Sequence, residues 1–471
     1  MAGKLWRSLL YTFKKDTLII LTHGYFLAED AKEQQIMKPY VPLGLLYISA
    51  YLEERDIKHE VLDSTFCNFE IFKKNILEKK PRLIGLYANL MTKINVLKII
   101  DFTKKEPTLR DCKIVLGGPE IRYNAENYLE QGADLLVVGE GEQTFFELCE
   151  HFIKEGELPE TIDGIAFIKN NNVLFTKERI LIKNIDLIPM PARKNIDLSL
   201  YGKAWKKHHG YSMYSVSTMR GCPYTCKWCS RAVYGGTYRR RSARLVVDEL
   251  EYLKVNYNPD RIWFVDDVFT INHKWLREFR DEVLQRKIVI PFEIITRADR
   301  MNEEVIGILK ETGCFRVWIG AESGSQKIID AMDRRVEVQM VREMIIKTKA
   351  AGIEAGTFIM VGYPGENKTD IRETINHLKL ADPSFYTITV AYPITGTPLY
   401  NEVQKTIKGS GDWKNQTDRD NDFKRTQSRK YYRYAIRWVS NEVNFKKSNR
   451  LLDKMKFKTK SFLAQALMMI S

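Results

Sequence analysis

Short apolar runs alternate with stretches of helical apolar spacing along most of this chain of 471 residues, and this alternation limits its fold more than any other feature. One alternating series occupies the residues up to 155, and a second begins after Ile188-Pro189-Met190-Pro191, where two prolines interrupt regular structure. Strand–helix alternation produces parallel sheets covered by helices, so the sequence predicts an α/β fold. The strands expected in the first series are residues 17–22, 60–63, 83–87, 114–116 and 135–138.

The chain is too long for one ordinary core, and the two series divide it into domains. Residues 1–187 are expected to form a Rossmann-like domain with a hairpin at 164–175, and residues 188–210 a linker. Residues 211–400 carry six strand–helix units, which predict a partial (β/α)6 barrel of the TIM type. Residues 401–471 lose the alternation and are expected to be helical and basic. The strands expected in the barrel are residues 215–218, 261–265, 292–295, 316–319, 357–361 and 386–390.

The positive charge of the chain is concentrated at its end. The net charge is +14, and residues 401–471 hold 17 Lys and Arg against 7 Asp and Glu, a net of +10. This excess indicates either an anionic partner or a solvated lysine-rich surface. Aromatic residues at 431–434 and Trp438 could stack nucleic-acid bases, but such a stripe is more typical of a packed helix face, so a nucleic-acid partner is not expected.

The chain has no apolar run long enough to span a membrane and no signal peptide at its start, so we expect a cytoplasmic protein without a transmembrane segment. An odd count of seven cysteines also suits a reducing compartment. Residues 5–15 and 455–467 mix lysines with aromatic or apolar residues. Such stretches either pack as ordinary amphipathic helices or lie in the headgroup layer, which would place the protein peripherally at the inner membrane surface.

Three cysteines crowd into eight residues, as Cys222-Pro-Tyr-Thr-Cys226-Lys-Trp-Cys229. Three thiolates on one loop can ligate three irons of a cubane cluster and leave the fourth iron without a protein ligand. An iron that is open in this way can bind a substrate and transfer an electron to it. A structural zinc site is the alternative, with His208 or His209 as a fourth ligand, and a chance group of buried cysteines is a weaker one.

This C-x3-C-x2-C loop, with an aromatic residue before its last cysteine, resembles the signature of the radical S-adenosylmethionine (SAM) superfamily. The resemblance implies a [4Fe–4S] cluster, SAM bound to the open iron, and reductive cleavage of SAM to a 5′-deoxyadenosyl radical. It also implies an external electron donor of the flavodoxin or ferredoxin type. Asp266 and Asp267 stand where the family often has Gly-Gly-Glu for the SAM amine. The residues that the resemblance assigns to SAM binding are Trp228, Asp266, Asp267, Arg297, Glu322, Ser323 and Gly362.

Segments of the first domain also resemble a known family. Its segments Pro42–Glu53, Gly117-Gly118-Pro119-Glu120 and Gly139-Glu140-Gly141-Glu142 are similar to the cobalamin-binding domain of B12-binding radical SAM proteins. The resemblance implies bound cobalamin, with Gly117, Gly118, Gly141 and Glu142 as its binding residues. The cobalt-ligating motif Asp-x-His-x-x-Gly is absent, and His23 ends the first expected strand without that context.

The two resemblances together predict a methyltransferase that acts on an unactivated carbon of a small-molecule substrate. If the protein lies at the membrane surface, that substrate is expected to be a lipid or isoprenoid. A radical cyclase, rearrangement or carbon–carbon coupling enzyme of the same architecture is the alternative. A methylthiotransferase is disfavoured because the solitary cysteines offer no second triad. A B12-, SAM- or nucleic-acid-binding module without catalysis is the alternative of another class. No further residue is assigned a catalytic role.

Overall fold

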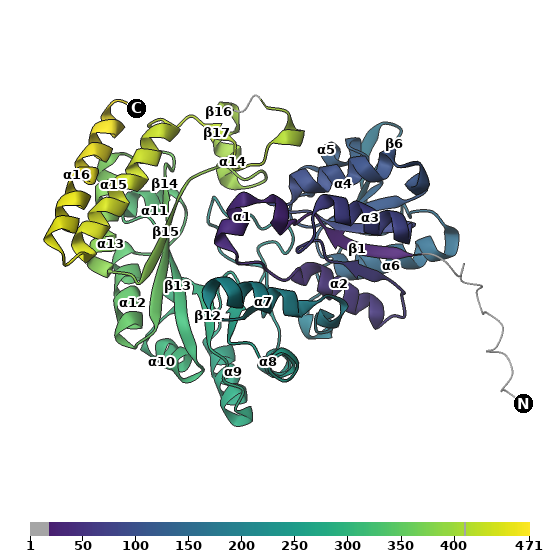
Figure 1. The fold of residues 1–471 in the computed structure, drawn as a ribbon, viewed down its shortest axis with the longest axis horizontal. Coiled ribbons are helices and arrows are strands. Elements are labelled where there is room, and N and C mark those ends of the chain that lie inside the picture. Colours follow the sequence, from purple (N-terminus) through teal and green to yellow (C-terminus); the bar gives the residue numbers. More distant parts are fainter. Residues whose placement is uncertain (1–17, 409–410) are drawn as a thin grey trace, which may run out of the picture. The chain divides into compact units, whose positions relative to one another are not determined.

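The computed structural model describes residues 18–408 and 411–471, and it divides the chain into two compact units (Figure 1). Unit 1 consists of Met1–Lys183 and Leu187–Leu200, and unit 2 consists of Asn184–Asp186 and Tyr201–Ser471. The amphipathic stretch expected at residues 5–15 lies outside the described residues.

Unit 1 is built on one seven-stranded sheet of order β2-β1-β3-β4-β5-β6-β7. The first five of these strands are parallel, and each strand predicted from the first series is present, with its ends within two residues of the prediction. The predicted hairpin is also present, as an antiparallel extension of the sheet. The strands are β1 (Ile19–His23), β2 (Glu60–Leu62), β3 (Leu83–Tyr87), β4 (Lys113–Gly117), β5 (Leu135–Val137), β6 (Ile165–Lys169) and β7 (Asn172–Phe175).

Helices cover this sheet and close a core of aliphatic and aromatic side chains. Leu52 of one helix and Leu148 and Phe152 of another are almost fully buried against Ile19 and Val115 of the strands. Burial of such side chains contributes roughly 1.5–3 kcal/mol each to the free energy of folding. The helices of unit 1 are α1 (Ala31–Ile36), α2 (Leu43–Glu53), α3 (Phe69–Lys79), α4 (Lys93–Lys105), α5 (Ala125–Glu130) and α6 (Gly141–Glu155).

The expected linker at 188–210 is not irregular throughout. It contains a 3-10 turn at Arg193–Asn195 and the helix α7 (Leu198–His209). Leu198, Tyr201 and Trp205 of α7 are buried and recur at helical spacing, which explains why a helix forms here. The two nearby prolines in the sequence obscured this pattern.

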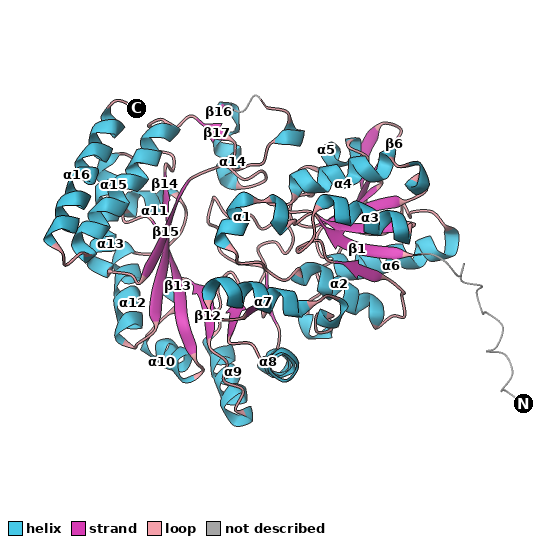
Figure 2. Cartoon of the chain, viewed as in Figure 1, coloured by secondary structure: helices cyan, strands magenta, loops and turns pink. Residues whose placement is uncertain are grey.

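Unit 2 contains an open, fully parallel sheet of six strands, which confirms the predicted partial barrel (Figure 2). Its order is β8-β11-β12-β13-β14-β15, so each strand lies beside the next one along the chain. The strands are β8 (Met213–Val216), β11 (Arg261–Phe264), β12 (Phe292–Thr296), β13 (Cys314–Glu322), β14 (Glu354–Val361) and β15 (Phe385–Val390). The connecting helices are α8 (Ala243–Tyr257), α9 (His273–Arg286), α10 (Glu303–Glu311), α11 (Gln326–Ala331), α12 (Val338–Ala350) and α13 (Lys368–Ala381).

Each of the six barrel strands differs from the sequence prediction at one or both ends, by one to three residues, and two of them show the physical cause. The first strand was expected at 215–218 but ends at Val216, because the backbone N–H of Thr218 donates to the carboxylate of Asp266 instead of joining the ladder. The strand expected at 316–319 is longer and runs on to Glu322 through a shift of register near Gly320.

The basic C-terminal region is helical, as predicted. After α14 (Pro398–Val403), the helices α15 (Arg429–Lys447) and α16 (Leu451–Met469) form an antiparallel pair, and α15 packs on α13 and β15. Tyr431, Tyr432 and Trp438 lie on the buried face of α15, so the aromatic stripe is a packed helix face. None of the described helices is both long and apolar enough to cross a membrane.

Candidate active site

The three clustered cysteines lie on a loop that the fold closes at both ends. The loop leaves β9 (Met219–Arg220), which pairs in antiparallel fashion with β10 (Arg239–Arg240) where the chain returns. Gly221 begins the loop with φ of 80°, and a Cβ atom there would lie 2.3 Å from the backbone oxygen of Thr237. Only glycine permits this turn. Cys226 is buried, and Cys222 and Cys229 are half-buried.

The donor set fits a cubane cluster better than a single ion. In the described part of the chain, no three His, Cys, Asp or Glu side chains are grouped as ligands of one metal ion. His209 packs against Trp205 and Tyr211, and neither His208 nor His209 is grouped with the cysteines among the described residues, so the zinc alternative lacks the fourth ligand proposed for it. A cubane, in contrast, binds each thiolate through a different iron. Burial raises the pKa of the Cys222 thiol, and burial together with Asp267 raises the pKa of Cys229 to about 12.

Two arginines approach the buried sulfur. Arg297, after β12, and Arg334, after α11, each direct Nη1 at Cys226 Sγ, at 3.7 and 3.6 Å. The Arg297 guanidinium also stacks on the Tyr224 ring, with Cζ 3.8 Å from the ring centroid, and bonds Asp299 through Nε at 2.8 Å. Two cations beside the sulfur stabilise a thiolate and the negative charge of a thiolate-ligated cluster.

Arg334 was not anticipated from the sequence. Its Nη2 donates to the Gly320 backbone oxygen at 2.8 Å and lies 3.7 Å from Glu322 Oε1. A Cβ at Gly320 would lie 2.3 Å from Arg334 Nη2, so this glycine makes room for the guanidinium. Arg334 Nε is buried without a hydrogen-bond partner among the described residues, so the side chain keeps a donor for a bound acidic group.

The structure separates the two neighbouring aspartates. Asp266 is buried, and its carboxylate accepts from Thr218 N at 2.7 Å and Met219 N at 3.2 Å, with Arg240 Nη2 3.5 Å away. It therefore holds the start of the cysteine loop. Asp267 makes no such bonds among the described residues, and it is near enough to Cys222 and Cys229 to raise their pKa. The pKa of Asp267 is itself raised by desolvation and by Asp266.

Glu322 ends β13 with φ of 63°, a left-handed backbone conformation that costs energy for any residue other than glycine. Burial raises the pKa of Glu322, and the charges of Arg334 and Arg297 oppose that effect. Ser323, the next residue, is turned to other partners: its hydroxyl contacts Thr374 Oγ1 at 3.2 Å and accepts from Ser325 N. Glu322 thus joins the group around the cysteines, whereas Ser323 ties the loop to α13.

The two remaining expected SAM contacts lie beside the apolar part of unit 2. Gly362 follows β14 with φ of 79°, and its N–H donates to Glu366 Oε2 at 2.5 Å. Trp228 packs against an apolar cluster that includes Met332 and Tyr363, and Arg334 Cζ lies 5.7 Å from its ring centroid. Cysteine thiols, an acidic group, two arginines and an apolar wall are therefore available on unit 2, a combination that suits a cluster with SAM.

The expected cobalamin residues lie at the carboxyl edge of the sheet of unit 1. Gly117 ends β4, and Gly118 follows with φ of 113°, where a Cβ would be 2.3 Å from the Ala88 backbone oxygen. Gly141 and the buried Glu142 begin α6 after β5. Ligands of such sheets bind at this edge. Because these glycines are small, the carboxyl edge of the sheet presents backbone rather than bulky side chains, and such a surface fits a flat ring.

His23 is fully engaged at the same edge. Tyr25 N donates to its Nδ1 at 3.1 Å, and its Nε2 lies 3.0 Å from Asp63 Oδ1. Although burial alone would raise the pKa of Asp63, hydrogen bonds from His23 and Thr65 hold it below its ordinary value. His23 therefore fixes the end of β1 and has no nitrogen left for a metal.

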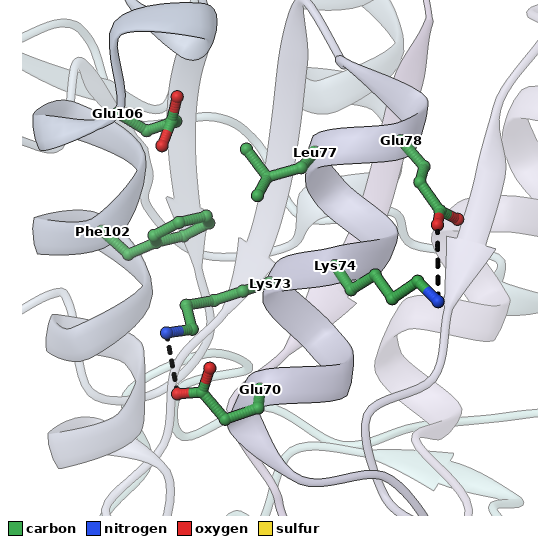
Figure 3. Close-up of a pocket in the computed structure, with 7 residues that line it drawn as sticks. All are labelled: Glu70, Lys73, Lys74, Leu77, Glu78, Phe102 and Glu106. Carbon is green, nitrogen blue, oxygen red and sulfur yellow. Dashed lines mark ion pairs between the residues drawn. The ribbon is translucent and has the colours of Figure 1, made fainter.

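A surface hollow between α3 and α4 is unrelated to either group of residues (Figure 3). Its walls carry the ion pairs Lys73–Glu70 at 2.7 Å and Lys74–Glu78 at 3.8 Å. Exposed pairs of this kind satisfy each other and contribute little binding energy. We assign no function to this hollow.

Comparison with known proteins identifies the two domains. Residues 216–378 match the radical SAM superfamily, and residues 36–149 match the B12 binding domain. An uncharacterized methyltransferase of Pyrococcus horikoshii is 30% identical over 366 residues, which cover 76% of this chain and 77% of that protein. The anaerobic magnesium-protoporphyrin IX monomethyl ester cyclase of Cereibacter sphaeroides is 25% identical over 306 residues, which cover 62% of this chain and 49% of that protein.

Among solved structures, the radical SAM methyltransferase TsrM from Kitasatospora setae, with cobalamin and a [4Fe–4S] cluster bound, has a TM-score of 0.68. It is 17% identical, over 83% of this chain and 75% of that chain, so this likeness is one of fold. The matched families identify the cofactors as a [4Fe–4S] cluster, SAM and cobalamin. Since identity to the Pyrococcus protein reaches 30% across 77% of its length, and both matched regions lie in one chain, the protein belongs to the radical SAM enzymes that carry a B12-binding domain.

Proposed function

We propose that this enzyme methylates an unactivated carbon of a small-molecule substrate and uses SAM both as methyl source and as radical source. The observation that carries the proposal is the union, in one chain, of the three-cysteine loop with a B12-binding domain, together with 30% identity to a relative named as a methyltransferase over 76% of this chain. When bound, the cluster supplies the electron for SAM cleavage and cobalamin carries the methyl group.

The residues of unit 2 divide into those that hold the cluster and those that bind SAM. Cys222, Cys226 and Cys229 hold the cluster. Asp267 accepts from the SAM amine, because Asp266 is already occupied by Thr218, Met219 and Arg240.

Other residues bind the carboxylate of SAM and its nucleoside. Arg297 or the free Nε of Arg334 pairs with the SAM carboxylate, and Glu322 accepts from the ribose hydroxyls. Trp228 and the backbone at Gly362 line the apolar side of the nucleoside. On unit 1, the backbone at Gly117, Gly118 and Gly141, with Glu142, holds cobalamin.

Product analysis tests the reaction type. The purified enzyme is reconstituted anaerobically with iron, sulfide and hydroxocobalamin, then given SAM, a low-potential reductant and candidate substrates. Methylation predicts both 5′-deoxyadenosine and S-adenosylhomocysteine in step with a methylated product. Formation of 5′-deoxyadenosine without S-adenosylhomocysteine would contradict methyl transfer.

A radical cyclisation is the second candidate, and the similarity to a cyclase over 62% of this chain favours it. The same assay separates the two reactions, because a cyclisation transfers no methyl group and leaves no S-adenosylhomocysteine.

We further propose that the electron donor is a protein of the flavodoxin or ferredoxin type. We also propose that the substrate is a lipid or isoprenoid and that the enzyme lies at the inner membrane surface. The exposed apolar face of the C-terminal helix supports a membrane location. Enzymatic reduction by a purified flavodoxin, in place of a chemical reductant, tests the donor.

A further inference from the structure

The C-terminal helix α16 exposes more large apolar side chains than any other helix in the described part of the chain. Elsewhere such side chains are scattered in ones and twos or confined to the hairpin β6–β7. A continuous exposed apolar face usually marks a contact with another molecule. The members of this face, each more than half exposed, are Leu451, Leu452, Met455, Phe462, Leu463 and Met469 of the helix, with Ile470 at its C-cap.

The face lies on the side of α16 that points away from the protein. The opposite side packs on α15 through Ser461, Ala464 and Met468, and Ser461 Oγ donates to Glu442 Oε1 at 2.6 Å. With about 3.6 residues per turn, Leu452 and Phe462 fall across the helix from these buried positions. Figure 1 shows α16 as the outermost helix of unit 2 beside α15.

Lysines border the apolar face on both sides. Lys454 and Lys458 run along one border at i,i+4 spacing, and Lys456 and Lys460 run along the other. Lys454, Lys456 and Lys460 have no ion-pair partner among the described residues, and Lys458 pairs with Glu442 at 3.2 Å. Asp453 is the single acidic residue of the helix, so the surface has a net charge of +3, from four lysines and one aspartate.

We propose that the outer face of α16 docks on a bilayer that contains anionic phospholipids. The apolar side chains would lie at the boundary of headgroups and acyl chains, and the flanking ammonium groups would reach the phosphates on their long stems. A second copy of the chain fits this face poorly, because its lysine borders would repel those of the first. This inference deepens the proposed membrane location and rests on it, but it does not depend on the reaction type.

Co-flotation of the full-length reconstituted enzyme with vesicles tests the proposal. The enzyme should float with vesicles of phosphatidylcholine mixed with phosphatidylglycerol, and less with phosphatidylcholine alone or at high salt. The Lys456→Gln/Lys460→Gln variant should lower the partition coefficient by roughly fivefold for each lysine removed. The Leu452→Gln/Phe462→Gln variant should lower it by about tenfold or more, because two exposed apolar side chains no longer enter the bilayer.

Two matched controls replace side chains of the same kinds elsewhere on unit 2. Val255→Gln removes an exposed apolar side chain on α8, and Lys274→Gln removes an exposed lysine on α9; neither should change flotation. Flotation that does not depend on phosphatidylglycerol, or that survives Leu452→Gln/Phe462→Gln, would overturn the proposal. So would a dimer in solution that the same variant converts to a monomer, since the face would then be a contact between copies.

The activity of each variant is measured on the same samples without vesicles. All four variants should still cleave SAM, because none of the changed residues lies near the cysteine loop. Normal flotation with no methylated product would count against the proposed reaction and leave the docking surface standing. Loss of flotation with normal SAM cleavage assigns the effect to the surface.

Discussion

At the scale of single residues, Asp266 and Asp267 follow the same strand and face different surroundings. Asp266→Asn places an amide against two backbone donors and removes the counterion of the buried Arg240, so the free energy of unfolding should fall by about 3 kcal/mol. Asp267→Asn should change it by less than about 0.5 kcal/mol but weaken SAM binding. Urea unfolding and equilibrium dialysis with SAM measure the two effects. Equal losses of stability would contradict this division of roles.

Arg334 and Arg335 provide a similar contrast. Arg334 is buried and contacts Cys226 and Gly320, whereas Arg335 is exposed and pairs with Asp333. Arg334→Gln leaves Glu322 without its nearest cation, so we expect a loss of about 2–3 kcal/mol in unfolding free energy and little 5′-deoxyadenosine. Arg335→Gln should behave as wild type in both urea unfolding and product assays. A variant Arg334→Gln with full activity would remove Arg334 from the site.

Glu366 should make the stability of unit 2 depend on pH. Burial raises its pKa to about 8, and Oε1 has no hydrogen-bond partner among the described residues. The folded protein therefore keeps a proton that the unfolded chain releases near its ordinary pKa. The stability from this proton is complete below that pKa and is lost as pH rises towards 8.

Glu366→Gln removes this dependence, so its advantage in unfolding free energy over wild type should grow by roughly 2–4 kcal/mol between about pH 5 and pH 8. Urea unfolding across that range measures the difference. Glu373→Gln, on the exposed side of α13, is the control and should run parallel to wild type. A constant difference for Glu366→Gln would show that its pKa is not raised.

The sequence predicts which residues come together where spacing alone decides it. The cysteines stand within one loop, so their spacing is enough to place them near one another. Arg334 lies 108 residues from Cys226 and comes after a short helix, so no local pattern connects the two. The two aspartates look alike in sequence, because only the fold shows which carboxylate meets the backbone of Thr218.

At the scale of elements, the turn after β4 depends on one glycine of a pair. Gly118→Ala would place a Cβ 2.3 Å from the Ala88 backbone oxygen at φ of 113°, so unit 1 should lose several kcal/mol and bind cobalamin poorly. Gly117→Ala meets only Val137 at 4.0 Å and should cost about 0.5 kcal/mol or less. Thermal unfolding and the visible spectrum of bound cobalamin report both effects. Similar behaviour of the two variants would refute this account of the turn.

Strands and helices were predictable where apolar residues recur along the whole element, on one face of α8 and on both faces of β3. Their ends were less so, because distant partners set them: Asp266 ends β8 by taking the N–H of Thr218. The helix α7 was missed because it begins soon after two prolines, a pattern typical of a linker. Its buried Tyr201 and Trp205 supply the stability that local sequence does not reveal.

At the scale of the whole molecule, the expected cofactor residues fall on different compact units. The cysteine loop belongs to unit 2, and Gly117, Gly118, Gly141 and Glu142 belong to unit 1. Each unit has its own sheet and its own buried core. Two units that are stabilised separately can bind their cofactors separately. Loss of one cofactor should therefore leave intact the residues that hold the other.

Cys226→Ala tests this independence. The variant loses one cluster ligand and leaves Arg297 and Arg334 facing an alanine, so its iron and sulfide content and its SAM cleavage should fall to near background. Its cobalamin content after reconstitution, read from the visible spectrum, should stay within about twofold of wild type, because unit 1 keeps its core. Cys314→Ala is the control, since Cys314 is a buried thiol in β13 outside the loop; it should keep both cofactors at some cost in stability. Loss of cobalamin together with the cluster in Cys226→Ala would mean that the two units do not bind their cofactors independently.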